Sequence, residues 1–260
     1  MATDLSELTA IINTFERPTA VRRLVRSIRA RHPELRVVVG DSSFQPTKVE
    51  QVDYVRLDPD AGAGAGRNAL LERVETPYFL QLDDDFQFIR RTRIARLIAP
   101  VENDLFDLVA GDCIRCKRKL RVFVKKRLEQ YHGLIELRNG TLRLTPGQRA
   151  VRQGVSVCDI APQFFVARTE QIVAAGGWDA DLKTEEHEEF FVRLKQHGVR
   201  VGHRPDVRVM HWSEMPANYD PFRLRSYRPL AAQKMGVTWW IDMNGEETTY
   251  PPATADQRAA

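Results

Sequence analysis

The sequence is poor in cysteine, in long apolar runs and in excess charge of one sign. Three cysteines among 260 residues cannot all pair within the chain, so a disulfide framework is not expected and a reducing compartment is. Cys113 and Cys116 form a single CxxC without a second pair, which favours structural thiols over a zinc site.

Other absences exclude whole classes of protein. No apolar stretch approaches the length of a membrane span. The opening MATDLSELTA lacks the basic region and apolar core of a signal peptide. The net charge of +4 is modest. Its basic residues gather at 115–127 (RCKRKLRVFVKKR), without aromatic stacking positions or a known nucleic-acid motif. We therefore expect a soluble, cytoplasmic protein that does not bind nucleic acid.

The basic segment 115–127 has two interpretations. A solvated face is the simpler one. The alternative is contact with a phosphorylated or acidic acceptor, or with an anionic membrane surface.

What the sequence does contain is an alternation of short buried strands with amphipathic helices. Hydrophobic residues make up 43% of the chain, and its length supports a full core. Strands are expected at 8–13, 35–39, 52–57, 78–82, 105–110, 163–167 and 207–212. Helices are expected from 18 to 28, 68 to 74, 92 to 101 and 182 to 198. Between 113 and 157, Asn139-Gly140 and Pro146-Gly147 predict hairpin turns. The prediction is an α/β fold with a mostly parallel central sheet flanked by helices and a small antiparallel excursion.

The strand at 78–82 ends at three consecutive carboxylates, Asp83, Asp84 and Asp85. Strand alternation places Asp83 and Asp85 on one face and Asp84 on the other. Two carboxylates on one side repel each other unless a cation lies between them, and oxygen ligands suit Mg²⁺ or Mn²⁺. An acidic loop or a helix N-cap is the alternative.

A glycine-rich segment, DPDAGAGAGRNALLERV, precedes that strand at 58–74. Its glycines match neither GxGxxG nor GxxxxGK[ST]. The helix that follows would favour an anion at its N-terminus, where Arg67 is placed to contact a diphosphate or a base ring. A flexible turn is the alternative.

Two late segments carry further candidate residues. Glu186, Glu189 and Arg193 fall about one helical turn apart. The glutamates and His187 either form an acidic first turn, which the helix dipole favours, or supply a general base. His211 ends the strand at 207–212. An isolated histidine is usually structural, but here it is a candidate third metal ligand.

Eight segments together resemble a known family, in that family's order over residues 9–213. They are TFERP at 14–18, VVVGDSS at 37–43, GAGRN at 64–68, YFLQLDDDF at 78–86, DLVAGDC at 107–113, CDIAPQFFVART at 158–169, HEEFF at 187–191 and VRVMHWS at 207–213. The chain resembles a nucleotide-sugar glycosyltransferase of the GT-A fold, in the broad family 2 group. More closely, it resembles the β-1,4-N-acetylgalactosaminyltransferases typified by the ganglioside GM2/GD2 synthases.

The resemblance implies roles for matching positions. Asp83 and Asp85 match the DxD site that holds Mn²⁺ or Mg²⁺ against the donor diphosphate, and His211 matches a late metal ligand. The residues that match the binding site of the donor nucleotide are Thr14, Glu16, Arg17, Asp41, Arg67, Asp83 and Asp84.

The general base is where the chain departs from the family. Many family 2 relatives carry Glu-Asp followed by x-Glu-Phe, with the Asp as base, whereas this chain has His187 at the Asp position. Glu189 and His187 are therefore ranked close together, with Glu186 and Glu188 behind them.

The resulting hypothesis is an inverting, metal-dependent transferase that moves a hexose, best N-acetylgalactosamine, from a UDP-sugar to a carbohydrate or other hydroxyl-bearing acceptor. The expected division is a donor half at 1–112, an acceptor and catalytic half at 113–215, and an extension at 216–260 that closes over the site or contacts a partner subunit.

The family's Golgi anchor and stem are not matched, so a soluble enzyme is expected, with peripheral membrane contact and a homo-oligomer left open. The alternatives are a metal-dependent nucleotidyltransferase and a non-catalytic nucleotide- or glycan-binding relative.

Overall fold

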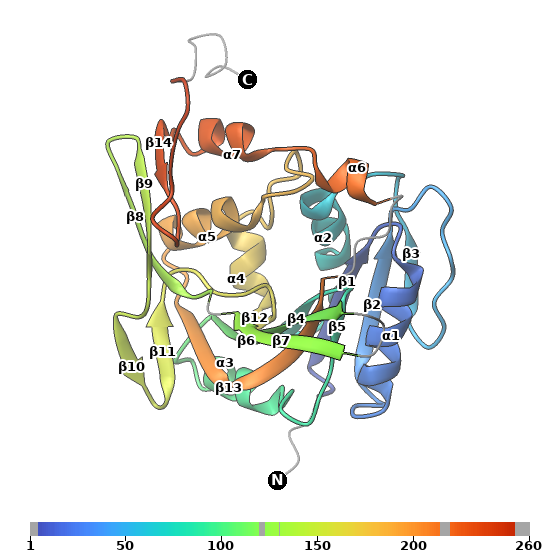
Figure 1. The fold of residues 1–260 in the computed structure, drawn as a ribbon. Helices are drawn as coiled ribbons and strands as arrows, with labels where there is room; N and C mark the ends of the chain where they lie inside the picture. The colour runs from blue at the N-terminus through green and yellow to red at the C-terminus, as the bar shows by residue number, and fades with distance from the viewer. Residues whose placement is uncertain (1–4, 120–122, 130, 214–218, 253–260) are drawn as a thin grey trace.

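A computed structural model of the chain describes residues 5–119, 123–129, 131–213 and 219–252. Its centre is a large sheet whose longest path runs in the order β10-β11-β13-β6-β12-β4-β1-β2-β3 (Figure 1). None of the helices in the described ranges is both long enough and apolar enough to cross a bilayer. Cys113, Cys116 and Cys158 are free and buried.

The N-terminal half of the sheet is parallel. Its strands are β1 (Leu8–Thr14), β2 (Arg36–Asp41), β3 (Asp53–Arg56) and β4 (Tyr78–Asp83). β1 lies between β2 and β4 and is parallel to both. All carboxyl ends of these strands therefore reach the same edge of the sheet, which is where α/β folds place ligands.

The second half of the sheet is mixed. Its main strands are β6 (Leu108–Lys119), β12 (Phe165–Arg168) and β13 (Val201–Trp212). β12 joins the two halves by antiparallel pairing with both β4 and β6, whereas β6 and β13 are parallel. Shorter strands complete it: β5 (Phe86–Gln87), β7 (Phe123–Glu129), β10 (Ala150–Arg152) and β11 (Val155–Cys158). The predicted α/β fold with a largely parallel central sheet is confirmed.

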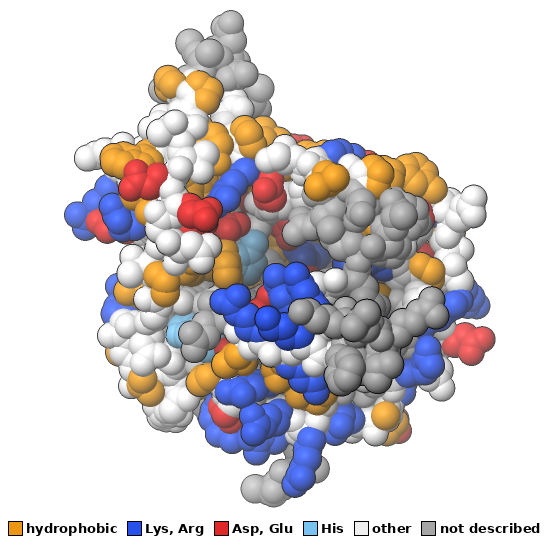
Figure 2. Space-filling view, viewed as in Figure 1, with side chains coloured by type: hydrophobic (Ala, Val, Ile, Leu, Met, Phe, Trp, Pro, Cys, Tyr) orange, Lys and Arg blue, Asp and Glu red, His pale blue; other side chains and the backbone are white. Residues whose placement is uncertain are grey.

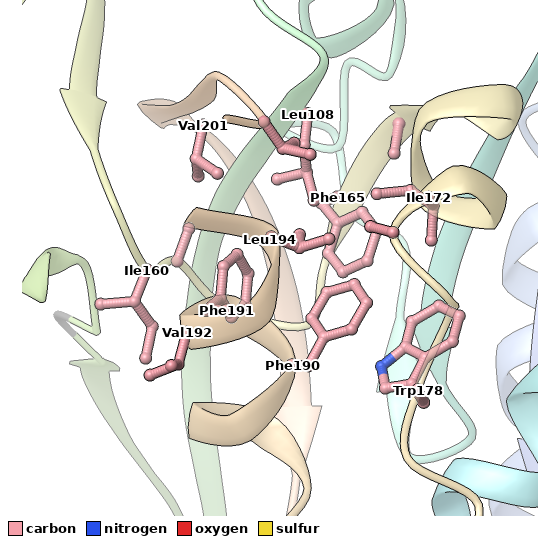
Figure 3. Packing of buried hydrophobic residues seen from close by; sticks show 14 of the residues in the cluster. Leu108, Ile160, Phe165, Ile172, Trp178, Phe190, Phe191, Val192, Leu194 and Val201 are labelled. Carbon is pink, nitrogen blue, oxygen red and sulfur yellow. The ribbon is translucent and has the colours of Figure 1, made fainter. Parts of the chain in front are cut away.

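Helices cover both faces of this sheet. α1 (Pro18–Arg29) and α3 (Ala95–Glu102) contribute to one core cluster, and α2 (Ala63–Leu71), α4 (Thr169–Ala174) and α5 (His187–Gln196) to the other. In the second cluster Trp178 stacks on Phe190, with ring centroids 4.6 Å apart, and both lie near Phe165 of β12 (Figure 3). This packing holds the N-terminal turn of α5 over the sheet.

A second, four-stranded sheet stands beside α5 (Figure 1). Its strands are β8 (Gly133–Arg138), β9 (Thr141–Pro146), β14 (Trp239–Ile241) and β15 (Glu247–Thr249). The predicted turn at Asn139-Gly140 joins β8 to β9. The described part of the extension also forms α6 (Asp220–Arg223) and α7 (Arg228–Lys234). Trp240 is 1% exposed within the same core cluster as α5, so this region is built into the main core.

Candidate functional site

A small pocket of about 140 Å³ opens at the carboxyl ends of β1 and β2. It is lined by three of the residues predicted to bind the donor nucleotide, Thr14, Glu16 and Asp41. The remaining lining residues are Pro18, Val21, Ser43, Gln45 and Thr47. Sequence analysis did not single out these five, although Ser43 ends the VVVGDSS segment that carried part of the family resemblance.

Asp41 is the most constrained carboxylate of this pocket. It is 3% exposed. The Ser43 amide donates to Oδ1 over 2.9 Å, and the Tyr54 hydroxyl donates to Oδ2 over 2.9 Å. Burial and the hydrogen bond to Asp41 raise the pKa of Tyr54 to about 12, so Tyr54 remains a donor at neutral pH. The carboxylate is thus held in one orientation beside the pocket.

Arg17 lies against the acidic triplet from the start of α1. Its Nη1 donates to Asp85 Oδ2 over 2.9 Å, and its Nε donates to Asp84 Oδ2 over 3.2 Å. Thr14 Oγ1 also donates to Asp84 Oδ2, over 2.7 Å. Both carboxylates are almost fully buried, at 1% and 4% exposed. The structure therefore joins four predicted residues in one buried charge cluster.

The two carboxylates of this cluster differ in acidity. Burial raises the pKa of Asp84, and the attraction of Arg17 offsets only part of that rise. Burial also opposes ionisation of Asp85, but Arg17 and His211 outweigh it and lower the pKa of that carboxyl. Asp85 is thus the more strongly ionised of the pair.

Asp83 has a separate partner, Arg67 of α2. Arg67 Nη2 donates to Asp83 Oδ1 over 2.9 Å, and its Nη1 donates to Glu186 Oε1 at the start of α5. Burial favours the neutral form of Arg67, but Glu186 and Asp83 outweigh it and raise its pKa. One buried cation therefore links the acidic triplet to the predicted base segment.

His211 lies on the other side of Asp85. Its Nε2 is 3.4 Å from Asp85 Oδ2, and its Nδ1 is 2.9 Å from Glu129 Oε2. Burial lowers the pKa of His211, but the hydrogen bonds to Asp85 and Glu129 outweigh this effect and raise it to about 10. Sequence analysis did not identify Glu129, because nothing in the basic segment around it marks a site residue.

The predicted metal ligands are brought together only in part. Asp85 and His211 are adjacent, but Asp83 is turned to Arg67, and the described residues include no group of three or more His, Cys, Asp or Glu arranged to hold a metal ion. Asp85 Oδ1 is buried without a hydrogen-bond partner among the residues that the structure describes. Carboxylate and imidazole donors with one such free oxygen are chemically suited to Mn²⁺ or Mg²⁺. The donor set therefore fits the predicted ion once Arg17 moves away from Asp85 and His211 Nε2 loses its proton.

The first turn of α5 gives its acidic residues different partners. Arg193 donates to both oxygens of Glu189, over 2.9 and 2.7 Å, and Tyr131 donates to Glu188 over 2.7 Å. Glu186 is buried against Arg67, which outweighs the effect of burial and lowers its pKa. His187 differs, because its Nε2 is buried and has no hydrogen-bond partner among the described residues.

Burial also sets the protonation of His187. It lowers the pKa of the imidazole and Arg67 lowers it further, whereas Glu188, Glu186 and Asp83 oppose this shift with smaller effects. The ring packs on Tyr131 and Phe191, at centroid distances of 5.0 and 5.1 Å. A neutral imidazole therefore lies within electrostatic range of Glu186, Arg67 and Asp83.

The glycine-rich segment has a role that neither sequence interpretation included. α2 begins at Ala63, five residues before the predicted start. The Ala63 and Gly64 amides donate to the carbonyls of Lys183 and Leu182, over 2.9 and 3.2 Å. A Cβ on Gly64 would lie 1.9 Å from the Asp179 carbonyl oxygen. The glycines allow two backbone segments to touch, so these amides are not available to a phosphate.

Comparison with known proteins places this site in context. The family model described as "Glycosyl transferase family 2" matches residues 9–158. Human beta-1,4 N-acetylgalactosaminyltransferase 1 is 33% identical over 219 residues, which cover 80% of this chain and 39% of the relative. Mouse beta-1,4 N-acetylgalactosaminyltransferase 2 is 31% identical over 220 residues, covering 80% of this chain and 40% of that protein. The chain thus spans about two fifths of the length of these relatives.

Two solved structures share the fold. GalNAc-T7, determined with UDP, GalNAc and Mn²⁺, superposes with a TM-score of 0.63 at 16% identity, covering 90% of this chain and 48% of the other. Residues 1–349 of S. aureus TarS, in complex with UDP-GlcNAc, give a TM-score of 0.61 at 15% identity, covering 88% and 64%. At these identities the similarity establishes a GT-A-like fold and nothing finer.

Proposed function

The chain belongs to glycosyl transferase family 2, and on that basis we propose that it transfers a sugar from a UDP-sugar to an acceptor hydroxyl, with inversion and with help from a divalent cation. The observation that carries the proposal is the pocket of Thr14, Glu16 and Asp41 next to the buried cluster of Arg17, Asp84 and Asp85. The Glu16 and Asp41 carboxylates in the pocket wall can accept hydrogen bonds from the N–H and hydroxyl groups of a nucleoside, and the Arg17 guanidinium lies beside the pocket, where a diphosphate would need a cation. Names of the relatives favour N-acetylgalactosamine as the sugar.

We assign the proton transfer to His187. Glu189 has both oxygens bound by Arg193, and Glu186 is paired with Arg67, so each is a weak proton acceptor. The lowered pKa of His187 keeps its imidazole neutral near pH 7, which a general base requires. In a single displacement, the imidazole takes the acceptor's proton and the acceptor oxygen attacks the anomeric carbon. As that bond forms, the bond from the anomeric carbon to the diphosphate oxygen breaks, and UDP leaves with its electron pair.

The divalent cation would be held by Asp85 and His211, with Asp83 as a further carboxylate. When bound, such an ion acts as a Lewis acid that offsets the charge of the departing diphosphate. This chain's own part is the orientation of those ligands: Glu129 holds the His211 ring through Nδ1, and Thr14 and Arg17 hold Asp84 beside them.

Calorimetric titration of UDP tests the donor site, first with Mn²⁺ and then with EDTA, followed by a panel of UDP-sugars. We expect metal-dependent binding with one preferred sugar. Asp41→Ala should weaken UDP binding at least about tenfold through loss of a buried acceptor. The exposed carboxylate Asp53, on the neighbouring strand β3, provides the matched control, since Asp53→Ala should bind as the parent does. Absence of UDP binding in both conditions would refute the proposal.

A further inference from the structure

β6 and β7 form an antiparallel ribbon whose described side chains include five cations, Arg115, Lys117, Lys125, Lys126 and Arg127; we call it the basic ribbon. All five are exposed, and even the ion-paired Arg115 side chain is 46% exposed. Figure 2 shows Lys and Arg side chains gathered in the middle of this face, where β6 and β7 run in Figure 1.

Like charges stand directly opposite each other in this ribbon. The register pairs Arg115 with Arg127 and Lys117 with Lys125. Directly opposed like charges destabilise an antiparallel pair. Arg115 has an acidic partner, Glu129, but the other four cations have none among the residues that the structure describes. The described part of the chain therefore offers no anion to compensate the Lys117–Lys125 pair.

The positive charge also reaches both faces of β7. Lys125, Lys126 and Arg127 are consecutive, and successive strand residues point to opposite sides. β7 hydrogen-bonds to β6 and to no other strand of the described chain. Next to these cations Val124 is 40% exposed. Lysine on an edge strand can serve simply to prevent pairing with the edge strand of another molecule. That role explains neither the exposed valine nor the pairs of directly opposed cations.

The ribbon adjoins the candidate active site. Arg115 pairs with Glu129, Glu129 with His211, and His211 with Asp85. Any surface that holds the ribbon therefore lies close to the proposed metal ligands His211 and Asp85.

We propose that the basic ribbon docks this protein on an anionic lipid surface. A two-sided cationic edge with an exposed apolar side chain suits a plane of anionic headgroups, where lysine and arginine meet the headgroup charges and the valine enters the interface. A binding site for a soluble anionic chain would need cations on one face only. The docking is independent of the sugar-transfer proposal, because UDP titration and vesicle binding are measured separately.

Cosedimentation with vesicles tests the docking at about 0.1 M salt. The full chain should bind vesicles of mixed phosphatidylglycerol and phosphatidylcholine and should leave vesicles of pure phosphatidylcholine in the supernatant. The triple substitution Lys125→Gln, Lys126→Gln, Arg127→Gln should lower the partition coefficient about 100-fold, since each cation near an anionic surface adds to binding. UDP affinity should be unchanged, which shows that the variant is folded.

The matched control removes three charges from exposed positions elsewhere, through Arg31→Gln, Arg73→Gln and Arg152→Gln. The partition coefficient of this control onto the anionic vesicles should fall by less than about threefold. An equal loss in both triple variants would overturn the proposal, because net charge alone would then explain binding. Equal binding to neutral and anionic vesicles would also overturn it. Binding of heparin through the ribbon, without any vesicle binding, would replace the lipid surface by a soluble anionic chain.

Discussion

Arg17 Nη1 lies 2.9 Å from Asp85 Oδ2, so a cation of the chain itself already neutralises the carboxylate predicted to bind a metal ion. Arg17 also pairs with Asp84, and both carboxylates are buried. A divalent ion therefore competes with a guanidinium for Asp85. Without a metal ion, Arg17 compensates the buried charges of Asp84 and Asp85. The same ion pairs lower the affinity of Asp85 for a metal ion, because the ion has to displace Arg17.

This competition predicts the behaviour of Arg17→Met. Without metal, the variant should lose about 3 kcal/mol of unfolding free energy, because a buried ion pair has lost one partner. Mn²⁺ should then raise its melting temperature more than it raises that of the parent. Thermal unfolding in EDTA and in Mn²⁺ measures both effects, with Arg22→Met, at an exposed position on α1, as the control. Equal Mn²⁺ shifts in the parent and Arg17→Met would show that Arg17 does not compete with the ion.

The pKa of His187 predicts the acid side of the pH profile. Burial places this pKa below its usual 6.5, and only the neutral imidazole accepts a proton. The rate should therefore stay flat as pH falls through 6.5 and decline only below the lowered pKa of His187. UDP release from the preferred UDP-sugar, with water as acceptor, provides the measurement.

Substitution of the same residue gives an independent prediction. His187→Asn should lower the rate of UDP release at least about 100-fold, which is the usual contribution of a general base, and leave UDP affinity intact. His197→Asn, at an exposed position after the other end of α5, is the control. Full activity of His187→Asn would move the role to one of the glutamates.

Glu189 is expected to act on stability instead. Its carboxylate is held on both oxygens by Arg193, which also donates to the Gly177 carbonyl over 2.8 Å. Glu189→Gln should cost about 1–3 kcal/mol of unfolding free energy, because a buried charged hydrogen bond is lost. The folded fraction should release UDP at nearly the parental rate. A stable variant with a rate reduced about 100-fold would instead identify Glu189 as the base.

Gly64→Ala should destabilise the chain strongly. The new methyl group would lie 1.9 Å from the Asp179 carbonyl, so α2 and the segment before α5 would have to separate. We expect the free energy of unfolding to fall by about 3 kcal/mol, which is at the upper end of the range for overpacked cores. Chemical denaturation measures it, with Ala65→Gly, one position along α2, as a control for helix propensity. A loss below about 1 kcal/mol would show that the two segments separate easily.

Much of the fold could be predicted because its determinants are local. The apolar run of β4 and the helical spacing of Val21, Leu24, Val25 and Ile28 on α1 appear within a few residues of sequence. The Asn139-Gly140 turn is equally local. Helix starts were less predictable. α2 begins at Ala63 because its first amides donate hydrogen bonds to carbonyls about 120 positions later in the chain.

The sequence by itself determined the alternation of strands and helices, the placement of carboxylates at a strand end and the resemblance to a family. Only the tertiary structure decided which charges pair: Arg17 with carboxylates 67 and 68 positions away, and Arg67 with Glu186, 119 positions away. The physical reason is that periodicity is a property of neighbours along the chain. The state of a buried charge depends on which distant segments the sheet brings to the same edge, and on how much water they exclude.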